Sequence, residues 1–447
     1  MKLTIIGGGG FRVPQIFEAI SNDGEHARVT ELCLFDVSSD RLQTIAKILE
    51  QLAPALASPP RVSCTLDLDE AVTGAAFVFS AMRVDGLEGR ILDERTALEL
   101  GVLGQETVGP GGLAYALRTL PLARRLAERV AALAPEAWVI NFTNPAGIVT
   151  ETMRRSLGDR VIGICDTPIG LMRRAVGAIG AQPDDVTFDY VGLNHLGWLR
   201  SVCTDGVDRL PGLLADDSAI ATIEEARLMG IDWVRALGAI PNEYLYYYYY
   251  NREATERIRL SVETRGEFLR KQQGSFYTGA HSHPDSALDL WNSTKHDRES
   301  SYMAESRPEE ERHSREQSDV DGGGYQTVAL NLMTGLTTGR ASTMILNVAN
   351  NGIVDGLPDD AVIEVPTTVH LGRLEPQKVA PVRGEMLGLM QQLKASEQLI
   401  IAASLERDAT LAWRGFAAHP LVDSVSVAKK LLDRYRAAIP GVAAAFD

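Results

Sequence analysis

Three short segments of this 447-residue chain carry side chains that could form a metal site: residues 141–145 (Asn-Phe-Thr-Asn-Pro), 165–168 (Cys-Asp-Thr-Pro) and 194–198 (Asn-His-Leu-Gly-Trp). Cys165 offers a soft thiolate and His195 an imidazole. Together they suit a borderline divalent ion whose remaining positions are filled by substrate hydroxyls and water. A cysteine and a histidine 30 residues apart are more often a buried thiol and a hydrogen-bonded histidine. Spacing alone therefore leaves both interpretations open.

A glycine run near the amino terminus could bind a dinucleotide. The run consists of Gly7, Gly8, Gly9 and Gly10. It follows an apolar segment and precedes a helical pattern, so its backbone could approach a pyrophosphate at a helix N-terminus. The third glycine of the dinucleotide fingerprint is missing, because Arg12 or Val13 stands in its place. Asp36 ends the next apolar segment, where a carboxylate would accept a ribose 2′-hydroxyl and disfavour a 2′-phosphate. The pattern predicts NAD rather than NADP, although a glycine turn without a ligand is the plain alternative.

The elements that must position these residues follow from hydrophobic periodicity. Strands are expected at residues 3–6, 31–35, 76–81 and 137–142, with helical segments between them. This alternation predicts a parallel, doubly wound sheet. The polar stretch 261–321 has no clear period, and we expect loops and lids with short helices there. Further regular structure is expected at 343–348, 361–365, 381–407 and 424–438. The length favours two domains, which we place at 1–165 and 166–447.

Net charge, the length of apolar runs and cysteine spacing restrict the partners and the location that we expect. The net charge of −15 argues against nucleic acid or an anionic membrane surface, although a local arginine cluster could still bind a small anion. No run approaches 18 apolar residues, so we expect no membrane span. The four cysteines have no disulfide-framework spacing, and the opening residues do not read as a signal peptide, so a cytoplasmic location is expected.

Two other motifs have weaker chemical signals. Residues 281–285 (His-Ser-His-Pro-Asp) superficially resemble a hydrolase metal motif, but they lie in the polar stretch and are interpreted as a loop. Residues 244–250 comprise Tyr244, Leu245 and five consecutive tyrosines. A structural aromatic patch is the plain interpretation. Five phenols in one helical run would nevertheless face every side of the helix, so at least one should point into a pocket.

Taken together, the motifs resemble glycoside hydrolase family 4, the NAD- and manganese-dependent glycosidases, and most closely its 6-phospho-β-glucosidase branch. The likeness covers nearly the whole chain. It runs through residues 83–90, 93–95, 104–112, 116–121, 141–147, 165–170, 192–198, 240–248, 350–352 and 357–360. The resemblance implies a Rossmann-like NAD domain followed by an α+β substrate and metal domain, as in lactate and malate dehydrogenases. A homodimer or homotetramer is also expected.

The resemblance assigns roles residue by residue. Cys165 and His195 match the metal ligands, and Tyr244 matches the catalytic base. Glu106 matches the acidic group that makes this tyrosine more basic. The positions that match contacts to the sugar or its phosphate are Arg90, Asn144 and Arg265. The residues expected to bind NAD are Gly7, Gly8, Gly9, Gly10, Phe11, Asp36 and Arg41.

Two departures from the family pattern affect the substrate. Residues 10–14 read Gly-Phe-Arg-Val-Pro, so a hydroxyl residue after the glycine turn is lost and Arg12 is gained. Arg12 could hold a phosphate or another anion, or simply pair with a surface carboxylate or the NAD pyrophosphate. Asp166 follows the cysteine, as in the 6-phospho-α-glucosidase branch, where an aspartate at this place looks like the general acid. The anomer is therefore left open.

The implied reaction differs from ordinary glycoside hydrolysis, for which the sequence offers no evident pair of flanking carboxylates. It consists of transient oxidation at C3 by NAD, metal-assisted proton abstraction at C2, elimination of the aglycone and addition of water. The expected substrate is a 6-phosphorylated glucoside. The alternatives are an NAD-dependent 2-hydroxy-acid dehydrogenase, a non-catalytic NAD sensor, and a glycosidase of the same family acting on a non-phosphorylated or α-linked sugar.

Overall fold

A single mixed β-sheet runs through the protein. The structure is a computed structural model that describes residues 1–22, 28–301 and 324–447. Within these residues the sheet has thirteen strands. Eleven follow one path in the order β10-β8-β7-β12-β11-β6-β5-β4-β1-β2-β3, while β13 pairs with β12 and β9 with β8. The glycine run thus begins at a strand with neighbours on both sides.

The amino-terminal half of the sheet is parallel, as the sequence predicts. Its strands are β1 (Lys2–Ile6), β2 (Glu31–Phe35), β3 (Arg61–Thr65), β4 (Phe77–Ser80), β5 (Trp138–Asn141) and β6 (Val161–Gly163). The helices of this half are α1 (Val13–Asn22), α2 (Ser39–Leu52), α3 (Leu68–Val72), α4 (Gly86–Glu99), α5 (Pro110–Leu133) and α6 (Ala146–Leu157). Leu3, Ile5, Leu32 and Leu34 are fully buried. Such burial on both faces explains why these strands are short, continuous apolar runs.

The second half of the sheet is antiparallel. Its strands are β7 (Val186–Leu193), β8 (Leu196–Thr204), β9 (Val207–Asp208), β10 (Ile240–Pro241), β11 (Ser342–Ala349), β12 (Val362–His370) and β13 (Arg373–Pro376). β11 joins the parallel half by pairing Asn347 with Gly163 of β6. The expected boundary at residue 165 therefore follows a strand that bridges both halves, and the two-domain division stays a prediction.

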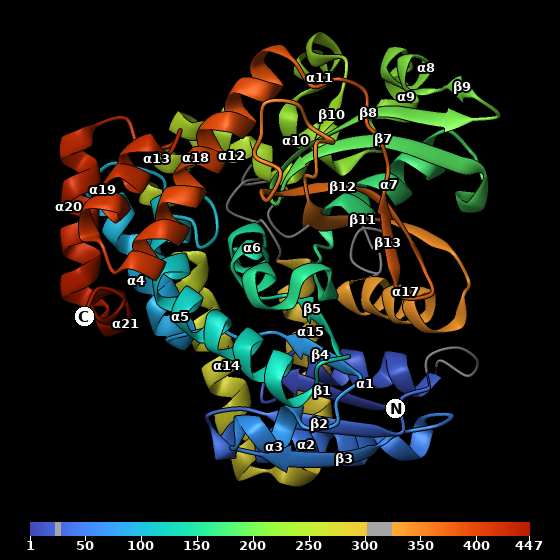
Figure 1. Ribbon diagram of the computed structural model, residues 1–447, viewed down its shortest axis with the longest axis vertical. Coiled ribbons are helices and arrows are strands. Elements are labelled where there is room, and N and C mark those ends of the chain that lie inside the picture. The colour runs from blue at the N-terminus through green and yellow to red at the C-terminus, as the bar shows by residue number, and fades with distance from the viewer. Residues whose placement is uncertain (23–27, 302–323) are drawn as a thin grey trace.

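Helices cover this half as well. They include α7 (Thr167–Ala178), α8 (Leu210–Ala215), α9 (Asp217–Ile220), α10 (Glu224–Met229), α11 (Ile231–Leu237), α12 (Tyr246–Tyr249) and α13 (Asn251–Leu260). After them come α17 (Tyr325–Thr338), α18 (Gly384–Glu406), α19 (Ala409–Ala418), α20 (Val425–Ala438) and α21 (Pro440–Ala444). Of these, α18, α20 and α21 pack against α4 or α5, and α19 packs between α18 and α20 (Figure 1).

The expectation of loops and short helices across 261–321 is wrong for its first part. Residues 265–300 form two long helices, α14 (Arg265–Ser282) and α15 (Ala287–Ser300), and α14 starts with a capping box between Thr264 and Glu267. Much of this hairpin's contact with the rest of the protein is polar, as when Gln51 donates to Pro284 O. A helix held by polar contacts lacks the apolar stripe that periodicity detects. Residues 302–321 lie outside the described part of the chain.

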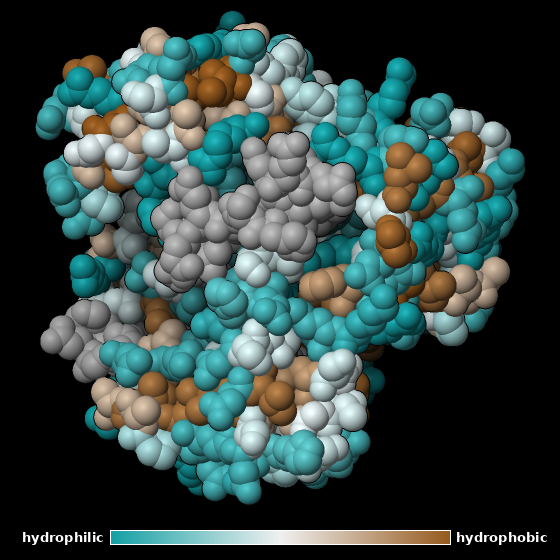
Figure 2. All heavy atoms as spheres, turned by 180° about the vertical axis from the view of Figure 1, so that it is seen from behind, coloured by the Kyte–Doolittle hydropathy of each residue, from teal (hydrophilic) through white to brown (hydrophobic). Residues whose placement is uncertain are grey.

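The face seen in Figure 2 is mostly hydrophilic, and its hydrophobic residues lie in small groups. In the described residues, no helix combines the length and the apolar character needed to cross a bilayer.

A buried ion pair between α4 and α5 also contacts α20, one of the carboxyl-terminal helices. Arg118 of α5 donates two hydrogen bonds to Asp93 of α4, at 2.7 and 2.6 Å, and both side chains are 1% exposed. The hydroxyl of Tyr435 in α20 donates to the carbonyl of Asp93 at 2.8 Å. Three helices therefore meet at this pair.

We expect Asp93→Asn to lower the free energy of unfolding by about 3–5 kcal/mol, because it removes the carboxylate that accepts two hydrogen bonds from the buried Arg118 and leaves, among the described carboxylates, only Asp85, 3.5 Å away, to pair with that charge. Urea denaturation measures this. Asp69→Asn is the matched control, since Asp69 makes a similar double contact with Arg129 at the surface and should cost no more than about 1 kcal/mol. Equal, small losses in both variants would contradict the prediction.

Candidate active site

The glycine turn lies at the carboxyl edge of the parallel strands. The amides of Gly7 and Gly8 both donate to Phe35 O, at 2.9 and 2.7 Å. Gly7 has φ +93°, and a Cβ there would lie 2.4 Å from Ala81 O, so only glycine fits between β2 and β4. Asp36 accepts hydrogen bonds from Gly9 N at 3.0 Å and from Ser38 N. The carboxylate expected to bind ribose therefore also shapes the turn.

The α14–α15 hairpin packs against this turn. Tyr277 donates to Gly9 O at 2.7 Å, and the guanidinium of Arg41 lies 4.7 Å from the centre of its ring. The ring of Phe11 is buried against Phe276 and Trp291. Any contact of Phe11 with a dinucleotide would therefore come from its backbone. Arg41 is exposed at the rim of the turn.

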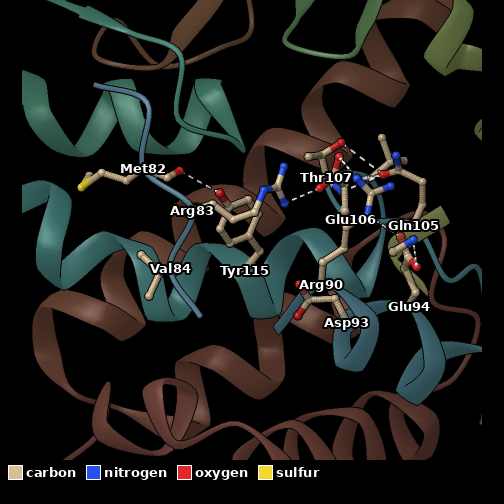
Figure 3. A network of polar contacts seen from close by, with 12 residues as sticks. Met82, Arg83, Val84, Arg90, Asp93, Glu94, Gln105, Glu106, Thr107 and Tyr115 are labelled. Atoms are coloured by element: carbon tan, nitrogen blue, oxygen red, sulfur yellow. Dashed lines mark hydrogen bonds and ion pairs between the residues drawn. The ribbon is translucent and has the colours of Figure 1, made fainter. Parts of the chain in front are cut away.

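A loop after α4 fixes the orientation of His195. The amide oxygen of Gln105 accepts from Thr107 N at 2.6 Å and from Thr107 Oγ1 at 3.1 Å (Figure 3). Thr107 Oγ1 lies 3.1 Å from His195 Nδ1. Because the single hydroxyl proton is directed at Gln105, Thr107 accepts from Nδ1–H. That tautomer leaves the lone pair of His195 Nε2 available to a metal.

The surroundings of His195 also keep it neutral. Burial lowers the pKa of His195 to about 3, with Glu106 acting weakly in the opposite direction. Its backbone has φ +64°, at the turn between β7 and β8. Tyr244 stacks on its ring, with centroids 3.7 Å apart and planes 8° from parallel. The structure thus brings the expected base against one expected ligand.

Cys165 follows β6 and is 2% exposed. Burial raises the pKa of its thiol well above the ordinary value, and the charges of Glu364 and Asp166 raise it further. Ionisation of this thiol would therefore need a cation, and a coordinated metal deprotonates thiols. The described residues contain no group of three or more His, Cys, Asp and Glu side chains suited to a metal. Cys165 and His195 therefore stay a candidate ligand pair, with substrate or water expected at the remaining positions.

Glu106 lies between two arginines. Its carboxylate is 2.5 Å from Arg83 Nη1 and 2.8 Å from Arg90 Nη1 (Figure 3). Burial alone would raise its pKa, but the two guanidinium groups lower the pKa of Glu106 to about 2. Arg90 also donates to Glu94 at 2.7 Å. Glu106 is thus a fixed negative charge, while its effect on Tyr244 stays a prediction.

The remaining candidates lie on other elements. Arg12 Nη1 lies 3.6 Å from Asp166 Oδ2, so it faces the expected general acid. Arg265 begins α14 and donates to Ser301 Oγ at 3.0 Å and to Arg298 O at 3.2 Å. Asn144 is half-buried in the segment between β5 and α6.

The tyrosine run is largely structural. Tyr249 accepts from Trp198 Nε1, and Tyr250 donates to Met229 O. One phenol does face a cavity, as the sequence predicts: Tyr248 lines a space of about 20 Å³ with His195, Glu397 and His419. Burial raises the pKa of Tyr248 above its usual range, so it is a poor base at neutral pH.

Several residues that contact the candidate site residues were not identified from the sequence. They are Gln105, Thr107, Tyr277, Arg298 and Glu364. Burial raises the pKa of Glu364 to about 7, against hydrogen bonds from Tyr190 and Asn347. A lone glutamate in the apolar run of β12 was the available signal, because a buried carboxylate needs partners.

The fold and the glycine turn define a Rossmann-like α/β protein. Residues 2–180 match the model for family 4 glycosyl hydrolases, and residues 190–422 match the model for the family's C-terminal domain. The chain belongs to glycosyl hydrolase family 4, and this confirms the resemblance drawn from its motifs.

Among proteins similar to this chain is a probable 6-phospho-beta-glucosidase of Bacillus subtilis, 30% identical over 97% of this chain and 95% of the relative. The Thermotoga maritima 6-phospho-beta-glucosidase with manganese, NAD+ and glucose-6-phosphate has a TM-score of 0.82, at 27% identity over 98% of both chains. A 6-phospho-alpha-glucosidase from gut microorganisms, in complex with NAD and glucose-6-phosphate, also scores 0.82, at 27% identity over 99% and 98%. This chain is therefore about equally similar to a relative named as a β-glucosidase and to one named as an α-glucosidase.

A lactate dehydrogenase from a deep-sea metagenome shares the fold alone, with a TM-score of 0.53 at 13% identity over 90% and 98% of the two chains. This confirms the expected fold class.

Thr107→Val should weaken metal binding 10- to 100-fold, the usual scale for removing the hydrogen-bond partner of a metal-ligating histidine. Titration of the purified protein with Mn²⁺ measures the affinity directly. Thr107→Ser keeps the hydroxyl and should stay within a few-fold of wild type. Unchanged Mn²⁺ affinity in the valine variant would show that this contact does not orient a ligand.

Proposed function

We propose that this enzyme hydrolyses 6-phosphorylated glucosides with NAD and a divalent metal, manganese in the first instance. The observation that carries the proposal is Tyr244 stacked on an imidazole whose Nδ1 is already engaged by Thr107. That arrangement supplies a base beside a ligand nitrogen. The relatives' NAD, manganese and glucose-6-phosphate complexes support the same choice of cofactors and substrate class.

The residues present fit both cofactors. Gly7, Gly9 and Asp36 would hold NAD at the turn, while Cys165 and His195 would hold the metal. When bound, NAD would accept a hydride from C3 and return it after water has added at C1, so the net reaction is hydrolysis, and the metal would act as a Lewis acid that makes the C2 proton acidic.

Tyr244 acts as the general base. A metal held by Cys165 and His195 would lower the pKa of the Tyr244 phenol, since an opposite charge favours the ionised form. The ionised oxygen takes the proton from C2. Stacking on His195 holds the ring in place, so the base need not search for its position. Glu106 keeps Arg83 and Arg90 paired and oriented around the substrate.

Asp166 donates a proton to the departing aglycone oxygen. Because the C2 proton leaves before the C1 bond breaks, the same base can serve either anomer. Arg90, Asn144 and Arg265 bind the sugar and its phosphate. We further propose that the enzyme works in the cytoplasm as a homodimer or homotetramer.

Wild-type enzyme should cleave nitrophenyl 6-phosphoglucosides only when NAD and Mn²⁺ are both present, and chelation should abolish turnover. Cys165→Ser should lose metal-dependent turnover while its NAD affinity stays within a few-fold. Cys203→Ser removes a thiol on β8 and serves as the matched control. Assaying the α and β substrates side by side reads out the anomer. Full activity after exhaustive chelation would contradict the proposal.

Proton abstraction at C2 predicts that product formed in deuterated water carries deuterium at C2, as detected by NMR. Tyr244→Phe should lose at least ~100-fold in rate, the scale of a general base. Tyr250→Phe, which removes a phenol bonded to Met229 O, should keep its activity. Product without C2 deuterium, together with a fully active Tyr244→Phe enzyme, would rule Tyr244 out.

A further inference from the structure

A row of polar and glycine residues crosses five strands of the sheet close to the candidate metal ligands. Its members are paired in register from β6 through β11, β12 and β7 to β8: Gly163, Asn347, Glu364, Gly192 and Gly197. The first member precedes Cys165 by two residues, and the last follows His195 by two residues. The row therefore lies beside both candidate ligands in the strands that carry them.

The polar members of this row take part in a buried chain of hydrogen bonds. Asn347 is 0% exposed and Glu364 is 1% exposed, and Asn347 Nδ2 donates to Glu364 Oε1 at 3.0 Å. The hydroxyl of Tyr190 donates to Glu364 Oε2 at 3.0 Å and accepts from Asn242 Nδ2 at 3.1 Å. Because an amide nitrogen can only donate, the single proton of Tyr190 is directed at Glu364. The chain thus runs in one direction, from Asn242 through Tyr190 to Glu364.

Glycine flanks this chain where the polar side chains take the space of a Cβ. A Cβ on Gly197 would lie 2.2 Å from the hydroxyl oxygen of Tyr190. A Cβ on Gly163 would lie 2.9 Å from Asn347 Cβ. Both distances are well inside van der Waals contact, which is optimal at about 3.5–4 Å. The sheet is therefore shaped around the phenol of Tyr190 and the amide of Asn347.

The chain ends on the segment that carries Tyr244. Asn242 is 1% exposed; its backbone amide donates to Gly197 O at 2.9 Å, and its carbonyl accepts from Leu245 N at 3.0 Å. Asn242 is thus held by both backbone and side chain, and Tyr244 follows two residues later, stacked on His195. Apolar side chains of the same shape could replace such a chain at little cost, so stability alone does not require it. Buried hydrogen bonds instead fix the distance and direction of the groups that they join.

We propose that Glu364 and Tyr190 are positioning residues, which fix Tyr244 for proton abstraction from the sugar. This inference rests on the proposed function, in which Tyr244 is the general base. Both residues act through Asn242 rather than on the substrate. Loss of the chain lets the Tyr244 segment shift, and a displacement of about 1 Å at a reacting group can cost about 100-fold in rate. The loss falls on the proton-transfer step, because other residues bind NAD and the sugar.

Tyr190→Phe keeps the ring and removes only the hydroxyl. We expect its kcat on a nitrophenyl 6-phosphoglucoside to fall roughly 10- to 100-fold, with KM and NAD affinity within about threefold of wild type. Tyr435→Phe is the matched control, since it removes another buried hydroxyl, which donates to Asp93 O at 2.8 Å. Both variants should lower the Tm to a similar extent, but Tyr435→Phe should keep its kcat.

A double variant separates positioning from a general structural role. If Tyr190 acts through Tyr244, then adding Tyr190→Phe to a Tyr244→Phe enzyme should lower the residual kcat by less than about threefold, because the base is already absent. A merely structural role lowers the fraction of active enzyme, and its loss would be multiplied in full in the double variant. That result would overturn the inference.

Substitutions of Glu364 test the same chain independently of Tyr190. Asn347 Oδ1 is buried and has no hydrogen-bond partner among the described residues. A rotated Asn347 amide could therefore accept from the glutamine of Glu364→Gln, whose oxygen still accepts from Tyr190. Glu364→Gln should accordingly retain at least about ten times the kcat of Glu364→Leu. Equal losses in the two variants would assign the role of Glu364 to its charge and contradict a positioning role.

The inference and the proposed function can fail separately. If Tyr244→Phe loses its activity while Tyr190→Phe keeps the wild-type kcat, only the inference is wrong. If Tyr244→Phe is fully active and the product carries no deuterium at C2, the proposed base is wrong, and the inference falls with it.

Discussion

The amide oxygen of Gln105 organises the loop on which the site depends. It accepts three hydrogen bonds, two from Thr107 and one from Val108 N at 2.7 Å. This compact turn holds Glu106 against its arginines and leaves Thr107 facing His195. Because the Thr107 proton is used within the loop, Gln105 decides the imidazole tautomer through Thr107. A single buried amide thereby links the positions of Glu106 and His195.

The continuous sheet brings together residues that lie far apart in the chain. Cys165 follows β6, Glu364 lies in β12, and His195 joins β7 to β8. In the sheet these strands follow one another as β6-β11-β12-β7-β8. The antiparallel extension thus sets its own edge residues beside the carboxyl end of the parallel strands, where α/β folds usually bind ligands. The two candidate metal ligands, Cys165 and His195, therefore come from other strands than the one that ends at the glycine turn.

Charge in this region is organised around Glu106. Its carboxylate holds Arg83 and Arg90 at short distance. Polar and aromatic contacts, such as the hydrogen bond from Trp291 to Phe11 O, fix the α14–α15 hairpin independently of those charges. Desolvated guanidinium groups held in place lose little freedom when an anion arrives, which favours tight and selective binding.

Much of the regular structure was determined by local sequence. The strand expected at 31–35 is β2 (Glu31–Phe35), and the helix expected at 424–438 is α20 (Val425–Ala438), because buried strands and amphipathic helices leave a short-range pattern. The motifs also identified the family and named Cys165, His195 and Tyr244 as a set. The sequence alone did not indicate the α14–α15 hairpin, whose polar partners lie more than 170 residues away, as Gly266 does from Glu94. Tertiary structure likewise decided the tautomer of His195 and the arginine pairing of Glu106. Each depends on groups that approach only after the chain has folded, and such contacts leave no periodic trace along it.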